Sequence, residues 1–321
     1  MRGASRGDRK DARESHNKFF QFVALAVWLF GIHLNVLICL LCLLCLVFLP
    51  IGWAITILVL WLSQILLPVF AETPFTDCVA RFIAKHAPAY FPIEAHAEDI
   101  DALDPNRAHV LALEPHSVLP ISLIATTKHY GFLPFVKSKA LATTAVFWTP
   151  VLRHVWSWLG LVPASKKICR EKLSDGYSCI VVPGGVQECL YLRHGHETIF
   201  LKKRFGFIRV AMEAGAPLVP CFCFGQSEVY HYWKPCGKWY ADLSRAIGFT
   251  PLIFWGMYGS PLPYPKRMYL VVGKPIEVQK NSSPSHEEVT EIQTKFIAAM
   301  EKLFEKHKVA AGYKDATLTV H

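Results

Sequence analysis

The first feature of this sequence is a long stretch without charge. Between Phe19 and Ala71 there is no Asp, Glu, Lys or Arg. One helix needs about 20 apolar residues to cross a bilayer, so this run is long enough for two. Pro50 and Gly52 mark the turn between them, because proline ends a helix and glycine frees the backbone. His33 and Asn35 interrupt the first segment and mark its entry into the membrane.

Three parts of the chain follow from this pattern. They are a basic cytosolic segment at 1–18, a membrane-embedded hairpin at 19–71 (about 19–49 and 53–70), and a cytosolic domain at 72–321. Lys and Arg beside the first span favour the cytoplasmic side, and an even number of spans returns the chain there.

Several other patterns are missing, and each absence excludes a class of protein. The ten cysteines show no paired metal spacing and no disulfide pattern, which fits a reducing compartment. His194 and His196 lack a partner at zinc spacing, so no metal is predicted. The absence of Gly-x-Ser-x-Gly argues against a serine hydrolase. No nucleic-acid motif is present, so nucleic acid is not an expected partner.

The cytosolic part alternates short apolar runs with helical patterns, which predicts an α/β domain with a largely parallel sheet. Ligands of such sheets bind beyond the carboxyl ends of the strands. A capping box at Ser285 and Glu288 begins the last helix. The other predicted strands and helices are strands at 108–113, 178–182, 218–224 and 268–272, and helices at 118–128, 165–175 and 205–213.

The first candidate for chemistry is Glu114-Pro115-His116-Ser117, directly after a predicted strand. The residue before proline is pushed into an extended conformation, in which residues two apart point the same way. Glu114 and His116 therefore project toward one site. A histidine can take a proton from an alcohol near neutral pH, and a carboxylate can orient its ring. A solvated histidine in a turn is the alternative.

The second candidate is Pro183-Gly184-Gly185-Val186-Gln187-Glu188, also after a predicted strand. Backbone N–H groups at Gly184 and Gly185 can approach a substrate closely and stabilise an oxyanion. Glu188 is a candidate to bind the acceptor or to orient His116. A simple tight turn is the alternative.

The third candidate is the basic stretch from Arg193 to Arg209. It holds Lys202, Lys203, Arg204 and Arg209, which suit the phosphates of coenzyme A. A solvated or membrane-facing run of charge is the alternative. The net charge of +9 fits either a polyanionic substrate or an anionic lipid surface.

Together these motifs resemble the type-2 diacylglycerol acyltransferase family, and the Glu-Pro-His-Ser form resembles its plant branch. Further motifs carry the resemblance: Arg204-Phe205-Gly206-Phe207-Ile208-Arg209, Val219-Pro220, Phe224-Gly225-Gln226 and Val272-Gly273-Lys274-Pro275-Ile276. Many members of that family have His-Pro-His-Gly in the first motif, so His116 carries over more firmly than Glu114.

The resemblance implies an N-terminal helical hairpin before a glycerolipid-acyltransferase-like α/β domain. It also implies an endoplasmic reticulum enzyme that moves an acyl group from acyl-CoA to diacylglycerol and reaches lipid droplets. Acyl-CoA is then a substrate and no cofactor is expected; diacylglycerol and membrane lipids are the other expected partners. Several alternatives stay open. The acceptor could instead be monoacylglycerol or a long-chain alcohol, or the chain could be a non-catalytic lipid-droplet protein. Two full spans or a re-entrant hairpin, and a homo-oligomer, also stay open.

Overall fold

The computed structural model describes residues 9–11, 17–69 and 73–321. A mixed sheet forms the body, and its strand order is β1-β2-β11-β8-β3-β6-β4-β5. All neighbouring pairs are parallel except β1 with β2 and β8 with β11. The predicted largely parallel sheet is confirmed. The eight strands are Arg9–Asp11 (β1), Ile93–Ala97 (β2), Val110–Glu114 (β3), Ser138–Ala142 (β4), Leu161–Pro163 (β5), Ser178–Val181 (β6), Leu218–Phe224 (β8) and Met268–Val272 (β11).

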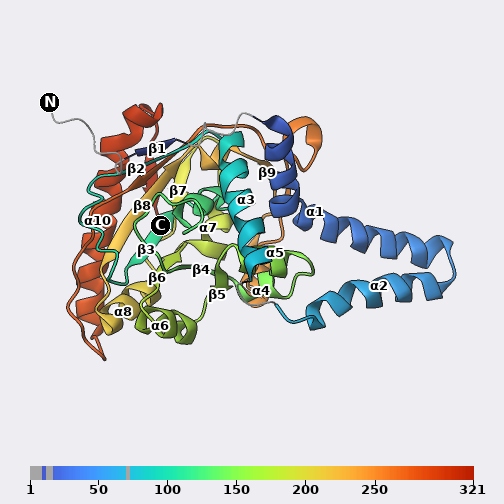
Figure 1. The fold of residues 1–321 in the computed structure, drawn as a ribbon, viewed down its shortest axis with the longest axis horizontal. Helices are drawn as coiled ribbons and strands as arrows, with labels where there is room; N and C mark the ends of the chain where they lie inside the picture. The colour runs from blue at the N-terminus through green and yellow to red at the C-terminus, as the bar shows by residue number, and fades with distance from the viewer. Residues whose placement is uncertain (1–8, 12–16, 70–72) are drawn as a thin grey trace.

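Helices cover both faces of this sheet, and a two-helix arm extends from one end (Figure 1). The α-helices are Lys18–Phe48 (α1), Ile51–Leu66 (α2), Pro74–Tyr90 (α3), Thr144–Phe147 (α4), Leu152–Trp158 (α5), Lys166–Ser174 (α6), Gly185–Tyr191 (α7), Gly206–Ala214 (α8), Lys238–Ile247 (α9) and His286–Ala311 (α10). Two small sheets pair Glu197–Ile199 (β7) with Leu318–Val320 (β12) and His231–Trp233 (β9) with Ile253–Trp255 (β10).

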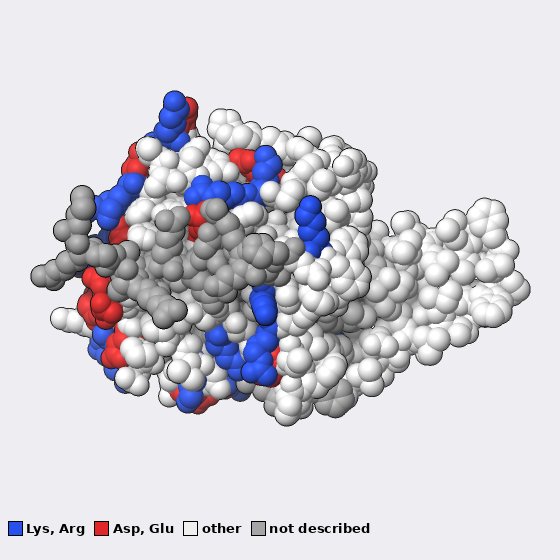
Figure 2. Space-filling view, turned by 45° about the horizontal axis from the view of Figure 1, so that its top comes forward, with Lys and Arg blue, Asp and Glu red and all other residues white. Residues whose placement is uncertain are grey.

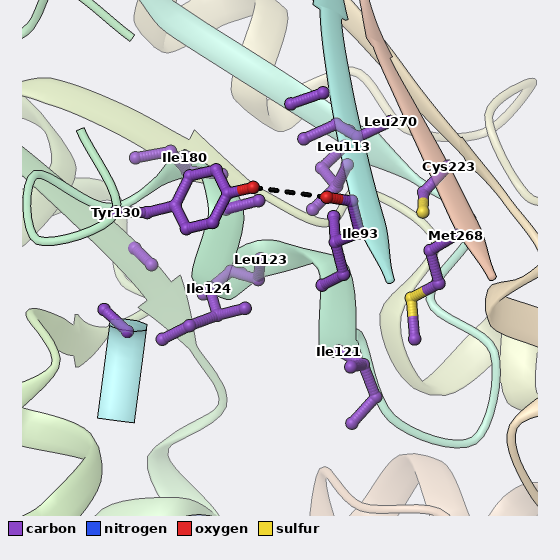
Figure 3. Close-up of a cluster of buried hydrophobic side chains, with 14 of the residues drawn as sticks. Ile93, Leu113, Ile121, Leu123, Ile124, Tyr130, Ile180, Cys223, Met268 and Leu270 are labelled. Atoms are coloured by element: carbon purple, nitrogen blue, oxygen red, sulfur yellow. Dashed lines mark hydrogen bonds between the residues drawn. The ribbon is translucent and has the colours of Figure 1, made fainter. Parts of the chain in front are cut away.

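Alternation along the strands divides the interior into two cores, because successive side chains of a strand point to opposite faces. In β3, Leu111 and Leu113 join the core under α1 and α3. Val110 and Ala112 join the core under α6, α8 and α10. Figure 3 shows part of the first core, where Tyr130 donates a hydrogen bond of 3.3 Å to the carbonyl of Ile93.

One predicted helix is different in the structure. Instead of an α-helix at 118–128, a short 3-10 helix spans Ile121–Thr126 (η2), and all six of its residues are buried. A buried turn between two strands has no room for a long helix with a solvent face. Thr126 and Thr127 also bond back to the carbonyls of Leu123 and Ile124, which favours the tighter helix.

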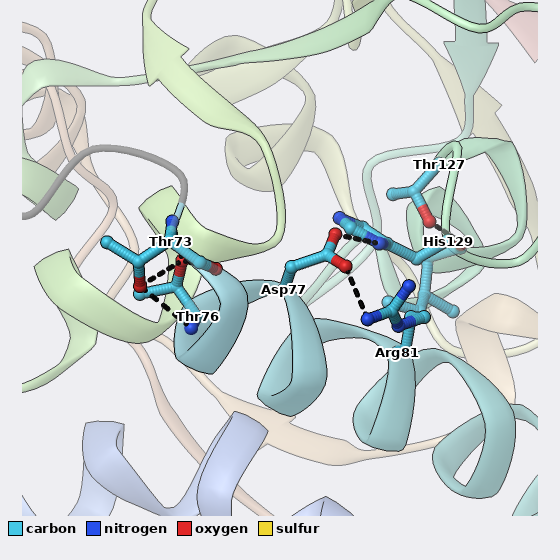
Figure 4. A network of polar contacts seen from close by, with 7 residues as sticks. Thr73, Thr76, Asp77, Arg81, Thr127 and His129 are labelled. Atoms are coloured by element: carbon cyan, nitrogen blue, oxygen red, sulfur yellow. Dashed lines mark hydrogen bonds and ion pairs between the residues drawn. The ribbon is translucent and has the colours of Figure 1, made fainter.

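Helix α3 holds this 3-10 segment in place from outside (Figure 4). Thr73 and Thr76 form its capping box, and Pro74 occupies its first turn. Asp77 pairs with Arg81 at 2.7 Å and lies 3.6 Å from Nδ1 of His129. The helix that carries Asp77 is thereby tied to the loop that follows η2.

The arm consists of α1 and α2, which meet at Leu49–Pro50, where the sequence predicted the turn. In the described residues, α1 is the single helix that is both long and apolar enough to cross a membrane. Near its start α1 packs against the body through the buried residues Ala24, Leu25 and Trp28. Most side chains beyond Leu34 are exposed and apolar.

Two contacts fasten the base of the arm. Asn35 donates to the carbonyl of Pro150 at 3.3 Å. Arg153 donates to the last carbonyls of α2, at Gln64, Ile65 and Leu67, which have no partner within the helix. Most of the predicted basic segment at 1–18 lies outside the described residues, as do residues 70–72 at the end of the predicted hairpin.

Candidate functional site

His116 lies at the carboxyl end of β3, a fully buried strand in the middle of the sheet. Glu114 is the last residue of that strand and is completely buried, whereas His116 is partly exposed. Ser117 has a φ of 55°, and the chain turns sharply there. The strand therefore delivers the predicted histidine to the edge of the sheet where ligands bind in such folds.

Glu188 holds the backbone of this turn. It lies in α7, which follows β6, the neighbour of β3. Its Oε1 accepts the N–H of Ser117 at 2.9 Å and also the N–H of His116. Gly184 makes room for it, because a Cβ at that position would lie 2.1 Å from Oε2 of Glu188. In the described residues neither Glu188 nor Glu114 hydrogen-bonds to the imidazole; Glu188 hydrogen-bonds to the main chain of the turn instead.

The two glutamates form a buried pair. Oε1 of Glu114 accepts the N–H of Gly184 at 3.1 Å. Burial raises the pKa of Glu114 well above its usual value, and Glu188 raises it further; burial likewise raises the pKa of Glu188. Oε2 of each carboxyl group is buried without a donor. Both pKa values therefore shift toward retention of a proton, as in buried carboxyl pairs that share one.

Arg204 is the predicted basic residue that interacts electrostatically with this pair. Its guanidinium donates to the carbonyl of Gly184 at 2.8 Å and stacks over the Phe200 ring at 5.2 Å. Burial lowers the pKa of Arg204, while Glu114 and Glu188 act in the opposite sense. Arg204 therefore balances the remaining charge of the glutamate pair and supports the Gly184 turn.

The imidazole of His116 is oriented by its own loop. Nδ1 lies 2.9 Å from the carbonyl oxygen of Ser117 and 3.4 Å from Sγ of Cys189. Since a carbonyl only accepts, Nδ1 must carry the hydrogen in this contact. The neutral ring then has its lone pair on Nε2, the atom a general base would use.

The charge of the ring depends on its neighbours. Burial favours the neutral ring, but Cys189, Glu188 and the Ser117 carbonyl together raise the pKa of His116 to about 10. This pKa favours the protonated ring near neutral pH. A role as general base requires the neutral ring, in which Nε2 has the lone pair.

Gln226 supports the other side of the turn; in the sequence it stands out only as part of the Phe224-Gly225-Gln226 motif, with no predicted role of its own. It follows β8 and is 1% exposed. Its side chain donates to the carbonyl of Pro115 and accepts from the N–H and hydroxyl of Ser122, at 2.8 and 2.6 Å. One buried amide thus ties the His116 turn to η2. The available signal was Gly225-Gln226 directly after a buried strand.

The remaining predicted site residues differ in what they contact. Gly184 and Gly185 lie at the start of α7, but the N–H of Gly184 already donates to Glu114. Lys202 and Lys203 are exposed in the turn before α8. Arg209 donates to the carbonyl of Pro284 at 2.5 Å, so it fastens α8 to the loop before α10. No group of three or more His, Cys, Asp or Glu in the described residues could hold a metal ion.

A histidine beside a buried carboxyl pair, at the carboxyl edge of a largely parallel sheet, is the arrangement expected of an enzyme. The sequence model of the diacylglycerol acyltransferase family matches residues 45–321, and the chain belongs to that family.

Similar proteins differ in the acceptor that their names give. Diacylglycerol O-acyltransferase 1 of Schizosaccharomyces pombe is 29% identical over 93% of this chain and 90% of its own. Acyl-CoA wax alcohol acyltransferase 2 of Mus musculus is 32% identical over 82% and 84%. The human 2-acylglycerol O-acyltransferase 3 is 30% identical over 74% of each chain. The acyltransferase PlsC of Thermotoga maritima aligns at 16% identity with a TM-score of 0.43, which is too low to establish a shared fold.

Gln226→Glu should separate positioning from folding. The change removes the donor to Pro115 but keeps an acceptor for Ser122. We expect kcat to fall by about tenfold to a hundredfold, because small displacements of a catalytic group are costly, while KM for acyl-CoA changes little. Steady-state kinetics in detergent micelles measures both.

Gln293→Glu is the matched control, because Gln293 is also buried and donates to a carbonyl, that of Leu201. Both variants lose one buried hydrogen bond, worth about 1–3 kcal/mol of stability. Equal kcat in the two variants at equal melting temperature would show that Gln226 has no positioning role.

Proposed function

We propose that this protein transfers a fatty acyl group from acyl-CoA to the free hydroxyl of diacylglycerol and so forms triacylglycerol. The observation that carries the proposal is the free Nε2 of His116, which Glu188, Gln226 and the Ser117 carbonyl hold at the sheet edge. Membership of the family and the name of the fission yeast relative supply the reaction.

In the proposed reaction Nε2 of His116 removes the hydroxyl proton as the oxygen attacks the thioester carbonyl. The C–S bond then breaks, and the thiolate of coenzyme A takes the proton from the imidazolium. The N–H of Gly185, at the start of α7, is the proposed donor to the oxyanion, since that of Gly184 is occupied by Glu114. Exposed Lys202 and Lys203 are the proposed contacts for the coenzyme A phosphates.

The arm is proposed to enter a single leaflet as a hairpin. Asn35 is bonded to the body, so the free part of α1 runs from there to Phe48 and is about 20 Å long at 1.5 Å per residue. The 16 residues of α2 give about 24 Å. Both are shorter than the hydrocarbon core of about 30 Å. Residues 9–11 (β1) pair with β2, so this part of the chain before α1 lies beside the body, as an arm with both ends on one side requires.

The cellular location is part of the same proposal. A hairpin with both ends in the cytosol suits the endoplasmic reticulum and also the monolayer of a lipid droplet, which has no second leaflet to cross. A fluorescent tag after His321 would report transfer from reticulum to droplets in oleate-fed cells, and retention in the reticulum alone would contradict it.

His116→Ala should abolish the reaction. In microsomes from cells that make no neutral lipid, labelled oleoyl-CoA and diacylglycerol should give labelled triacylglycerol with the parent chain. The variant should lose on the order of a hundredfold or more of this activity, the usual contribution of a general base. His286→Ala removes an exposed histidine from the start of α10 and serves as the control.

Adding monoacylglycerol and a long-chain alcohol as competing acceptors identifies the preferred substrate. Label that collects in another ester would change the acceptor and keep the chemistry. Near-normal turnover by a folded His116→Ala protein would falsify the role of the histidine.

The turn of the arm should stay out of the lumen. We would insert a long Gly-Ser loop with a central glycosylation sequon between Leu49 and Pro50, so that distance from the membrane does not limit the transferase. The single-leaflet hairpin predicts an unmodified protein in microsomes, and the same loop in a secreted reporter controls for sequon use. Glycosylation of the inserted loop would establish two full spans.

A further inference from the structure

Helix α9 exposes a strip of large apolar side chains. Trp239, Leu243 and Ile247 are 62%, 43% and 48% exposed. They are spaced by four residues and therefore lie on one face of the helix. Contiguous exposed apolar surface of this kind usually marks an interaction site.

The rest of α9 shows that this strip is not simply a loosely packed core face. Tyr240 and Ser244 form the buried face, and Tyr240 donates to the carbonyl of Pro251 at 2.8 Å. Asp242 and Arg245, paired at 2.9 Å, lie on the opposite, charged side. The apolar strip lies between the packed face and the charged face, as in helices that rest in a membrane interface.

The apolar surface continues past the end of the helix. Phe249, Ile253 and Tyr258 are 50%, 62% and 93% exposed. Thr143 donates to the carbonyl of Gly248 at 2.9 Å and so joins this segment to α4, beside which Trp148 is 67% exposed.

This surface is continuous with the base of the arm. His33 of α1 lies 3.5 Å from the carbonyl of Phe254, and their rings are 4.8 Å apart. Figure 1 shows β9 next to the first part of α1. In Figure 2 the Lys, Arg, Asp and Glu side chains gather on the part of the body away from the arm, and the arm shows none.

We propose that α9 and the segment from Phe249 to Tyr258 form a second membrane-docking surface, which lies in the same lipid interface that the arm enters. The occupant is the lipid bilayer itself, because the surface is apolar, carries Trp and Tyr as membrane interfaces favour, and adjoins the anchor. The proposal rests on the proposed insertion of the arm. Two attachments hold the body at one angle, so that the site faces the membrane from which its lipid substrates come.

Photo-crosslinking tests the occupant directly. The full chain with Trp239→p-benzoylphenylalanine is reconstituted in phosphatidylcholine vesicles that contain a radiolabelled phospholipid and is then irradiated. We expect several-fold more lipid label than with Arg245→p-benzoylphenylalanine on the charged face of the same helix. Equal labelling at the two positions would overturn the proposal. A protein dimer in place of a lipid adduct at position 239 would also overturn it, because the dimer would identify a second copy as the occupant.

A kinetic comparison tests the consequence. Leu243→Ser with Ile247→Ser should raise KM for diacylglycerol several-fold in vesicles and leave turnover of short-chain diacylglycerol in detergent unchanged, which also shows that the variant is folded. An unchanged KM in vesicles would contradict the surface. If the parent forms no triacylglycerol at all, the proposed function fails, while the lipid label at position 239 still decides the docking surface.

Discussion

The site depends on one carboxyl group, that of Glu188, which accepts two consecutive backbone N–H groups at His116 and Ser117. A buried carboxyl in that position fixes where the strand ends and where the histidine points. Glu114 forms a buried pair with it, and burial raises the pKa of both groups. The imidazole is then oriented by the Ser117 carbonyl, so the acidic residues hold the main chain of the turn.

The fold supplies what this turn requires. Parallel neighbours β3, β6 and β8 end at one edge, so Glu114, Glu188 and Gln226 arrive there from three separate strand ends. The two cores hold those strands from both faces. At one end of the body, Asn35 joins α1 to the carbonyl of Pro150, and Phe254, in the segment after α9, lies beside His33 of α1. The proposed chemistry thus depends on the sheet, and the proposed contact with lipid depends on the helices at the base of the arm.

Much of this organisation could be predicted from the sequence. The uncharged run predicted both arm helices and their turn, since composition alone decides what can enter lipid. The strand-end motifs predicted that His116 and Glu188 meet, because parallel strands end together. The capping box at Ser285 fixed the start of α10. Thr73 followed by Pro74 is an equally plain signal for a helix start, and α3 begins there.

Other features could not be predicted because they depend on side chains distant in sequence. The hydrogen bonds of Gln226 join residues more than 100 positions apart. The basic stretch looked uniform, yet Arg204 supports the glutamate pair, Arg209 fastens α8, and Lys202 is exposed. The charge pattern of α9 indicates an amphipathic helix, but only its packing shows which apolar residues remain uncovered.

The turnover of Glu188→Gln relative to Glu188→Leu tests the central claim most directly. An amide oxygen can still accept both N–H groups, and its NH2 can donate to Glu114, whereas leucine can do neither. If Glu188 acts by holding the turn, Gln should keep kcat within about tenfold of the parent and Leu should lose about a hundredfold, as for a misplaced catalytic group. Equal inactivity of two folded variants would contradict the account and would make the charge or the proton of Glu188 part of the reaction itself.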